Sequence, residues 1–148
     1  MNRKILALVA ALALVIVLAV LLWPTALRAY AVAQIEAAKR DGVYATPEEG
    51  MRARIEQHYR DIDRVVIDHS GTNSFDGRLP HVWFVTARVY AAARGDGKAI
   101  PAGEYDLPGS YFLHVDDGWV HVPEGAFPEL IGGAMERFGL YGAISNSG

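Results

Sequence analysis

The chain lacks cysteine altogether, which excludes disulfides, thiolate metal sites and thiol catalysis. It also lacks an N-x-S/T glycosylation sequon, an internal repeat and any low-complexity segment. No stretch matches a catalytic, nucleotide-binding or nucleic-acid-binding motif with useful specificity. The sequence therefore gives more information about placement and fold than about chemistry.

Positive charge is scarce beyond the N-terminal end. Of the 14 Lys and Arg residues, Arg3 and Lys4 precede the first apolar stretch. That leaves 12 basic residues against 17 Asp and Glu, a charge of −5 over the rest of the chain. This balance argues against a nucleic-acid partner and against polybasic binding to anionic lipid.

Charge is absent from residues 5–23, an apolar run that ends in Trp23. As a helix this run would be about 28 Å long, close to the roughly 30 Å hydrocarbon thickness of a bilayer. It predicts a transmembrane anchor whose partner is the lipid bilayer, with Trp23 as an interfacial aromatic residue. Arg3 and Lys4 lie in the flank 1–4, which we expect to stay cytoplasmic, so that the remaining chain is extracytoplasmic.

A cleaved secretory signal is the alternative interpretation of the same stretch. Such signals also begin with basic residues, and Ala29/Ala31 and Ala31/Ala33 offer the small-x-small spacing that a peptidase accepts. Their apolar region is usually about 7 to 15 residues, shorter than the run found here. The length favours an uncleaved, single-pass signal-anchor, whereas cleavage would give a secreted protein.

The chain after the anchor has room for one small domain and its connector. We expect a juxtamembrane helix and linker over 24–45, an extracytoplasmic α+β domain over 46–142 and a flexible tail over 143–148. Residues 25–40 are alanine-rich and place an apolar stripe on one helical side, which we expect to pack on the domain rather than to stand free as a stalk. The stripe consists of Leu27, Ala31, Gln34, Ile35 and Ala38.

Two further helices have clear start or stop residues. Thr46, Pro47 and Glu49 form a capping box that begins one helix, and apolar residues then follow at spacings of three and four. The other helix, 128–138, has a proline in its first turn and Gly139 as a left-handed terminator. The two adjacent glycines in its middle predict a close approach to another backbone.

Strand patterns lie between these helices. They cover 63–70, 81–93, a short edge strand at 104–107 and the hairpin 111–123, and the apolar residues on both faces of 81–93 predict a central position. The fold class is therefore α+β: two helices after the anchor, an antiparallel meander of four or five strands, and a C-terminal helix. This order is similar in outline over 46–123 to cystatin-like and NTF2-like domains, in which helices fold onto one face of a curved meander.

The hairpin has the clearest local pattern. Asp117 and Gly118 between apolar runs predict a two-residue turn, because both positions need positive φ. This turn would pair His114 with His121 on one face of the ribbon. The opposite face would be formed by Leu113, Val115, Val120 and Val122.

The histidine pair predicted by this register is the sharpest candidate site. Facing Cβ atoms about 5 Å apart would let His114 and His121 reach one divalent transition-metal ion, with Asp116 as a third ligand. A pH-responsive contact is a milder version, because two facing imidazoles disfavour double protonation. The alternative is two histidines on a solvated sheet face without a ligand.

A second polar group flanks the glycine-rich loop. Asp68, His69, Asp76 and His81 would form an acid/base group at one end of the sheet, but a nucleophile, a base and an orienting group cannot all be named. Turn chemistry is the simpler explanation of the loop. His58 lies on the apolar side of its helix, where we expect a partly buried, hydrogen-bonded histidine.

Aromatic residues suggest a partner-binding surface. Phe112, Trp119 and Phe127 would form a rigid patch, and the simpler alternative is that they are core beneath the C-terminal helix. Residues 94–96 spell the Arg-Gly-Asp adhesion tripeptide, for which an exposed turn is the better explanation.

The leading hypothesis is a membrane-anchored, extracytoplasmic binding module whose partner is a protein or another envelope component. The rival hypothesis is a small cystatin- or NTF2-like enzyme or ligand carrier with a concave sheet lined by His and Asp. A pocket of useful volume lined by His58, His81 or Asp68 would favour the rival. A filled core with an exposed aromatic patch would favour the module.

Overall fold

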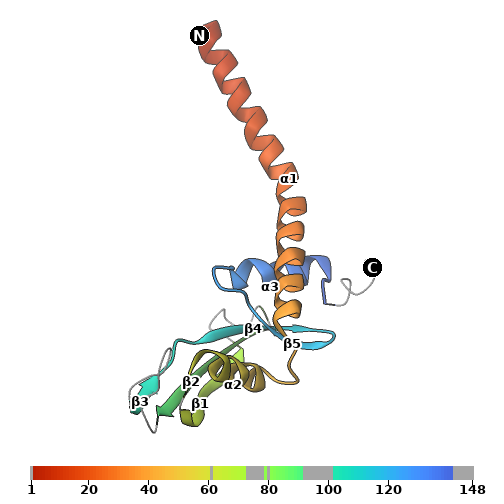
Figure 1. The fold of residues 1–148 in the computed structure, drawn as a ribbon. Helices are drawn as coiled ribbons and strands as arrows, with labels where there is room; N and C mark the ends of the chain where they lie inside the picture. Colours follow the sequence, from red (N-terminus) through yellow and green to blue (C-terminus); the bar gives the residue numbers. More distant parts are fainter. Residues whose placement is uncertain (1, 61, 73–78, 80, 92–101, 142–148) are drawn as a thin grey trace.

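The computed structural model describes residues 2–60, 62–72, 79, 81–91 and 102–141. The described residues form three helices and a five-stranded antiparallel sheet, which confirms the α+β class (Figure 1). The helices are α1 (Arg3–Asp41), α2 (Pro47–His58) and α3 (Pro128–Phe138). The strands are β1 (Ile62–Thr72), β2 (Val82–Ala91), β3 (Gly103–Asp106), β4 (Ser110–Val115) and β5 (Gly118–His121). The tail predicted over 143–148 lies outside the described residues.

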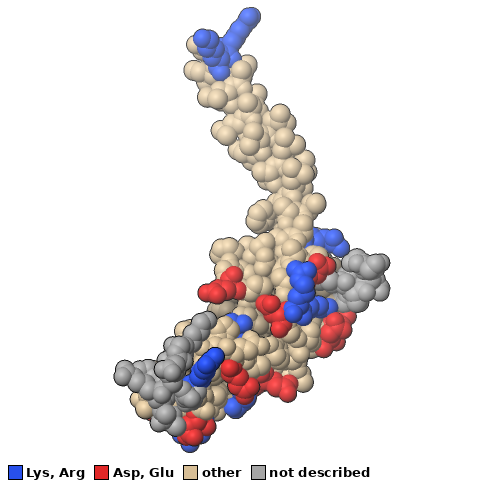
Figure 2. All heavy atoms as spheres, in the orientation of Figure 1, with Lys and Arg blue, Asp and Glu red and all other residues tan. Residues whose placement is uncertain are grey.

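Helix α1 joins the predicted anchor and the predicted juxtamembrane helix into one helix of 39 residues. It bends about halfway along its length (Figure 1), and Pro24, which has no amide hydrogen to donate, lies inside it. Its most apolar 18-residue window is wholly exposed, and Figure 2 shows an uncharged shaft between the basic tip and the charged domain. The helix is therefore long and apolar enough to cross a membrane, and in this window it is no core helix of the domain.

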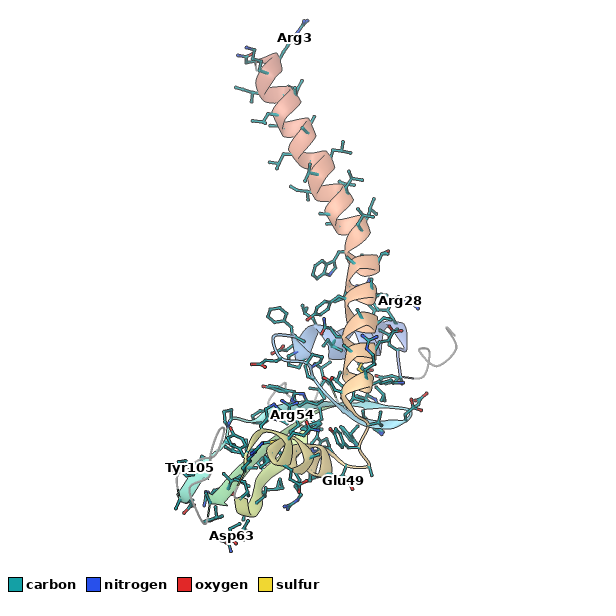
Figure 3. All side chains as sticks on the ribbon, viewed as in Figure 1. Arg3, Arg28, Glu49, Arg54, Asp63 and Tyr105 are labelled. Carbon is teal, nitrogen blue, oxygen red and sulfur yellow. The ribbon has the colours of Figure 1, made fainter. Side chains whose placement is uncertain are left out.

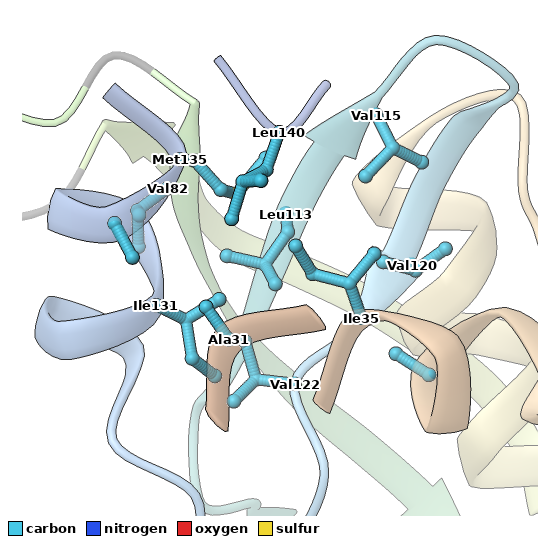
Figure 4. Close-up of a cluster of buried hydrophobic side chains, with 12 residues drawn as sticks. Ala31, Ile35, Val82, Leu113, Val115, Val120, Val122, Ile131, Met135 and Leu140 are labelled. Atoms are coloured by element: carbon cyan, nitrogen blue, oxygen red, sulfur yellow. The ribbon is translucent and has the colours of Figure 1, made fainter. Parts of the chain in front are cut away.

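The C-terminal part of α1 belongs to the hydrophobic core of the domain. Ala31, Ile35 and Ala38 are fully buried against α3 and β5, which confirms packing over a free stalk. Figure 4 shows Ile35 and Ala31 among the side chains of β4, β5 and α3. The rest of this cluster is Val82, Leu113, Val115, Val120, Val122, Ile131, Ala134, Met135 and Leu140.

Strand β2 lies at the centre of the sheet, as predicted. One edge pairs with β1, and the other pairs with β4 near Val82 and with β3 near Ala91. Strands β3 and β4 are therefore two halves of one interrupted strand, separated by a stretch that contains Gly109. A Cβ atom at Gly109 would lie 2.1 Å from the ring of Phe84, so a larger residue there would force this ring to move. The order is β1-β2-β4-β5, with β3 beside β2.

Helices cover both faces of the sheet, which corrects the expectation of helices on one face. Helices α1 and α3 pack on the face that carries Val82 and Leu113. Helix α2 packs on the opposite face, where Met51 and Ile55 contact Val85, Ala87, Val89 and Phe112. The order of the elements along the chain does not show which face of the sheet each helix will cover.

The predicted register of the hairpin is wrong by one turn residue. The turn is formed by Asp116 and Asp117, so His114 pairs with Trp119 and His121 pairs with Phe112. The faces nevertheless stay as predicted, with both histidines on one side and the valines on the other, because moving the turn by one residue shifts the partner by two. The two histidines are diagonal neighbours rather than a facing pair.

The predicted helix ends are found in the structure. The Thr46 hydroxyl accepts from the Glu49 amide at 3.2 Å, and the Glu49 carboxylate accepts from the Ala45 amide at 3.1 Å. Gly139 ends α3 in the left-handed region with φ 61°. The close approach expected of the glycine pair occurs at Gly132 only, and the neighbour is side chain rather than backbone.

Candidate ligand cleft

A cleft of about 490 Å³ opens between α2 and the place where β4 begins and β5 ends. The cleft lies where the hairpin ends. The Val122 amide donates to the Tyr111 carbonyl at 2.9 Å, and the chain then leaves the sheet at Pro123. The departing chain and α2 form the two walls. Apolar parts of the lining come from Met51, Ile55, Tyr59, Leu107 and Val122.

The polar part of this cleft is basic and imidazole-rich. Arg54 and His58 project from successive turns of α2, and His121 projects from the end of β5. Figure 3 shows Arg54 where α2 approaches the β4–β5 ribbon. A second hollow of about 320 Å³ shares these three residues and extends the cleft toward Asp41. Glu124, which is exposed, lines both hollows.

His121 is the one polar side chain in the buried class among the residues that the structure describes. Its ring meets that of Phe112 edge to face, with centroids 5.3 Å apart. Burial, together with the charge of Arg54 and the proximity of His58, lowers the pKa of His121 to about 4. The imidazole is therefore neutral near pH 7 and offers the cleft both a donor and an acceptor nitrogen.

His58 and Arg54 are left with unused hydrogen-bonding capacity. The His58 Nδ1 lies 2.8 Å from the Arg54 carbonyl, which can only accept, so Nδ1 carries the hydrogen and Nε2 is the acceptor of the neutral ring. His58, the last residue of α2, is exposed rather than partly buried as expected. No carboxylate in the described part of the chain forms an ion pair with the half-buried Arg54.

The residues predicted to bind metal do not converge. His114 is exposed and stacks on Trp119 with ring centroids 4.6 Å apart, whereas His121 is buried in the cleft. Asp116, the predicted third ligand, lies in the turn, where its amide donates to the Tyr141 carbonyl at 3.0 Å. Across the described ranges no group of three or more His, Asp or Glu side chains is placed to hold a metal ion.

The proposed acid/base group is also spread over separate contacts. Asp68 lies 3.7 Å from the Arg88 guanidinium on β2. His69 tilts against Phe84 with centroids 6.4 Å apart. His81 stacks on His114 and approaches Glu136 of α3 at 3.6 Å. Asp76 and the tripeptide 94–96 lie outside the described residues.

The three predicted partner-binding aromatics point to different places. Phe112 is fully buried beneath α2, so it belongs to the core. Trp119 is half-buried and meets Trp83 edge to face at 5.4 Å between centroids. Phe127 is 60% exposed at the start of α3. Of the predicted patch, only Phe127 is a largely exposed apolar side chain.

Sequence reasoning missed the cleft and its central residue, Arg54. The one local indication was the four-residue spacing of Arg54 and His58, which puts both on one side of a helix. The opposite wall comes from residues more than fifty positions later. No family model matches the chain, and no curated protein and no solved structure is found to resemble it.

Proposed function

We propose that this chain is a membrane-anchored, extracytoplasmic binding module whose cleft takes a small organic anion with an apolar body. The observation that carries the proposal is the cleft itself, in which two histidines and an arginine without an ion pair to any described carboxylate adjoin apolar walls. Charge-assisted hydrogen bonds to a carboxylate or sulfonate would satisfy Arg54, and the apolar lining would bury the body of the ligand. The cleft supports a small-molecule ligand over the protein partner of the leading hypothesis.

Two observations support the anchor over a cleaved signal. The helix continues unbroken from the apolar run into the domain. Cleavage after Ala31 or Ala33 would also remove Leu27 and Tyr30, which pack against the core. The basic residues at the N-terminal tip favour a cytoplasmic N-terminus and an extracytoplasmic domain.

The anion proposal is tested with 2-naphthoate and its uncharged amide as probes. The full chain is reconstituted in phosphatidylcholine nanodiscs, and binding is followed by calorimetry against empty nanodiscs. Naphthoate should bind and naphthamide should bind at least about tenfold more weakly, since a charged hydrogen bond contributes about 1.5 to 3 kcal/mol. Equal binding of the two probes, or of neither, would contradict the proposal.

A matched pair of arginine variants on α2 localises the site. Arg54→Gln should weaken naphthoate binding about tenfold or more, because it removes the guanidinium from the cleft. Arg52→Gln removes the same charge from the same helix, but Arg52 donates to the Val65 carbonyl at 3.1 Å and does not line the cleft. It should bind naphthoate like the parent chain. Similar losses in both variants would show a general charge effect rather than this site.

A further inference from the structure

An apolar part of the domain surface lies next to α1, between its bend and the sheet. Phe127 is 60% exposed and Leu130 is 38% exposed, both at the start of α3. Figure 1 shows α3 crossing α1 below the bend, and the sheet lies on the far side of α3 from the apolar shaft. The exposed side of α3 therefore faces the same direction as the apolar part of α1.

A hydrogen bond fixes the position of Phe127 along the axis of α1. Its amide donates to the Tyr30 hydroxyl at 3.0 Å. Tyr30 follows Trp23 by seven residues, which is about 10 Å along a helix, and its side chain tilts back toward the helix N-terminus. Headgroups occupy roughly 5 to 7 Å on each side of the hydrocarbon core. If Trp23 marks the interface, Phe127 reaches the headgroup layer.

The geometry points to a second membrane contact: we propose that Phe127 and Leu130 dock the folded domain onto the bilayer that α1 crosses. The proposal rests on the anchor in the proposed function, because α1 sets the position of the bilayer. Glu124 and Glu129 adjoin Phe127 in the sequence and are exposed, so the contact depends on apolar insertion rather than on attraction to anionic lipid. Zwitterionic lipid is therefore sufficient.

Docking is measured with nitroxide labels, since the chain has no native cysteine. Phe127→Cys and Leu130→Cys report on the proposed contact, Leu14→Cys on the anchor, and Glu56→Cys on the exposed side of α2. Each full-length variant is placed in phosphatidylcholine vesicles. Collision of the label with oxygen, which concentrates in lipid, is compared with collision with a water-soluble nickel chelate.

The labels at Phe127 and Leu130 should be less accessible to the nickel chelate than the label at Glu56, and the label at Leu14 should be the most protected. Phe127→Ala combined with the Leu130 label should restore accessibility, while the thermal unfolding of the domain stays unchanged. Docking is overturned if both α3 labels are as accessible as Glu56 while Leu14 is protected, and the anchor then stands. A nickel-accessible label at Leu14 would overturn the anchor and docking together.

Discussion

The two faces of the sheet have different chemistry. Among the residues that the structure describes, the fully buried side chains under α1 and α3 are all apolar. The face under α2 also has an apolar cluster, but it carries the buried His121 and a half-open cleft beside it. One face is closed and the other is accessible.

We therefore expect the first face to determine the stability of the domain and the second face to bind ligand. The α1 and α3 face joins the long apolar helix to the domain, so its packing fixes how that helix is oriented relative to the sheet. On the α2 face, by contrast, Arg54 forms no ion pair with a carboxylate in the described part of the chain. Changes on the first face should therefore alter stability, whereas changes in the cleft should alter pH dependence and ligand binding.

The largest expected effect comes from Ile35→Ala. Ile35 is fully buried between α1 and the sheet, and removal of a buried isoleucine side chain lowers the free energy of unfolding by about 2 to 5 kcal/mol. Denaturant unfolding of the detergent-solubilised full chain measures this loss. Val20→Ala, in the same helix but 66% exposed, should leave unfolding of the domain nearly unchanged. Equal effects of the two variants would show that α1 is not part of the domain core.

The second largest expected effect is a pH dependence of the free energy of unfolding, which comes from His121 on the α2 face. The pKa of His121 is about 4 in the folded chain and near 6.5 when unfolded, so between these values the unfolded state binds more protons. The free energy of unfolding should therefore fall as pH falls from 6.5 to 4, by up to about 3 kcal/mol. Unfolding curves measured across this range should show the fall, and His121→Gln should reduce it.

His114, the exposed histidine of the hairpin, provides the control for this pH dependence. His114→Gln removes a histidine from the same ribbon, but one whose ring is exposed and stacked on Trp119. Its pH profile should follow that of the parent chain between 6.5 and 4. An undiminished slope in His121→Gln would assign the effect to other groups.

Local sequence patterns predicted the ends of elements better than their partners. Thr46 and Gly139 act on backbone within a few residues, so their roles could be predicted. The hairpin register could not, because Gly118 serves a distant contact. A Cβ there would lie 2.7 Å from the Tyr44 carbonyl oxygen, and Tyr44 exchanges two 2.8 Å backbone hydrogen bonds with Trp119. Gly118 is therefore needed for the pairing of β5 with Tyr44 in the linker, and not for the hairpin turn.

The cleft was beyond sequence reasoning for a similar reason. Along α2, Arg52 and Arg54 have the same chemistry and differ only in what the fold places opposite them. One meets the edge of β1, and the other meets the chain that leaves β5. His121 likewise became important through burial, which depends on α2 packing across it. Residue type could indicate candidates, but tertiary packing selected among them.

The smallest expected effects come from substituting the two adjacent glycines of α3, which tests how closely this helix packs on the sheet. A Cβ at Gly132 would lie 2.5 Å from Val82 Cγ2, so Gly132→Ala should lower the free energy of unfolding by about 1 to 3 kcal/mol. A Cβ at Gly133 would meet no heavy atom within 4 Å, so Gly133→Ala should raise it by up to about 1 kcal/mol through helix propensity. Opposite signs in denaturant unfolding would show that close packing against β2, rather than helix weakness, explains the glycine at 132. Stabilisation by both substitutions would mean that α3 is not tightly packed on that face.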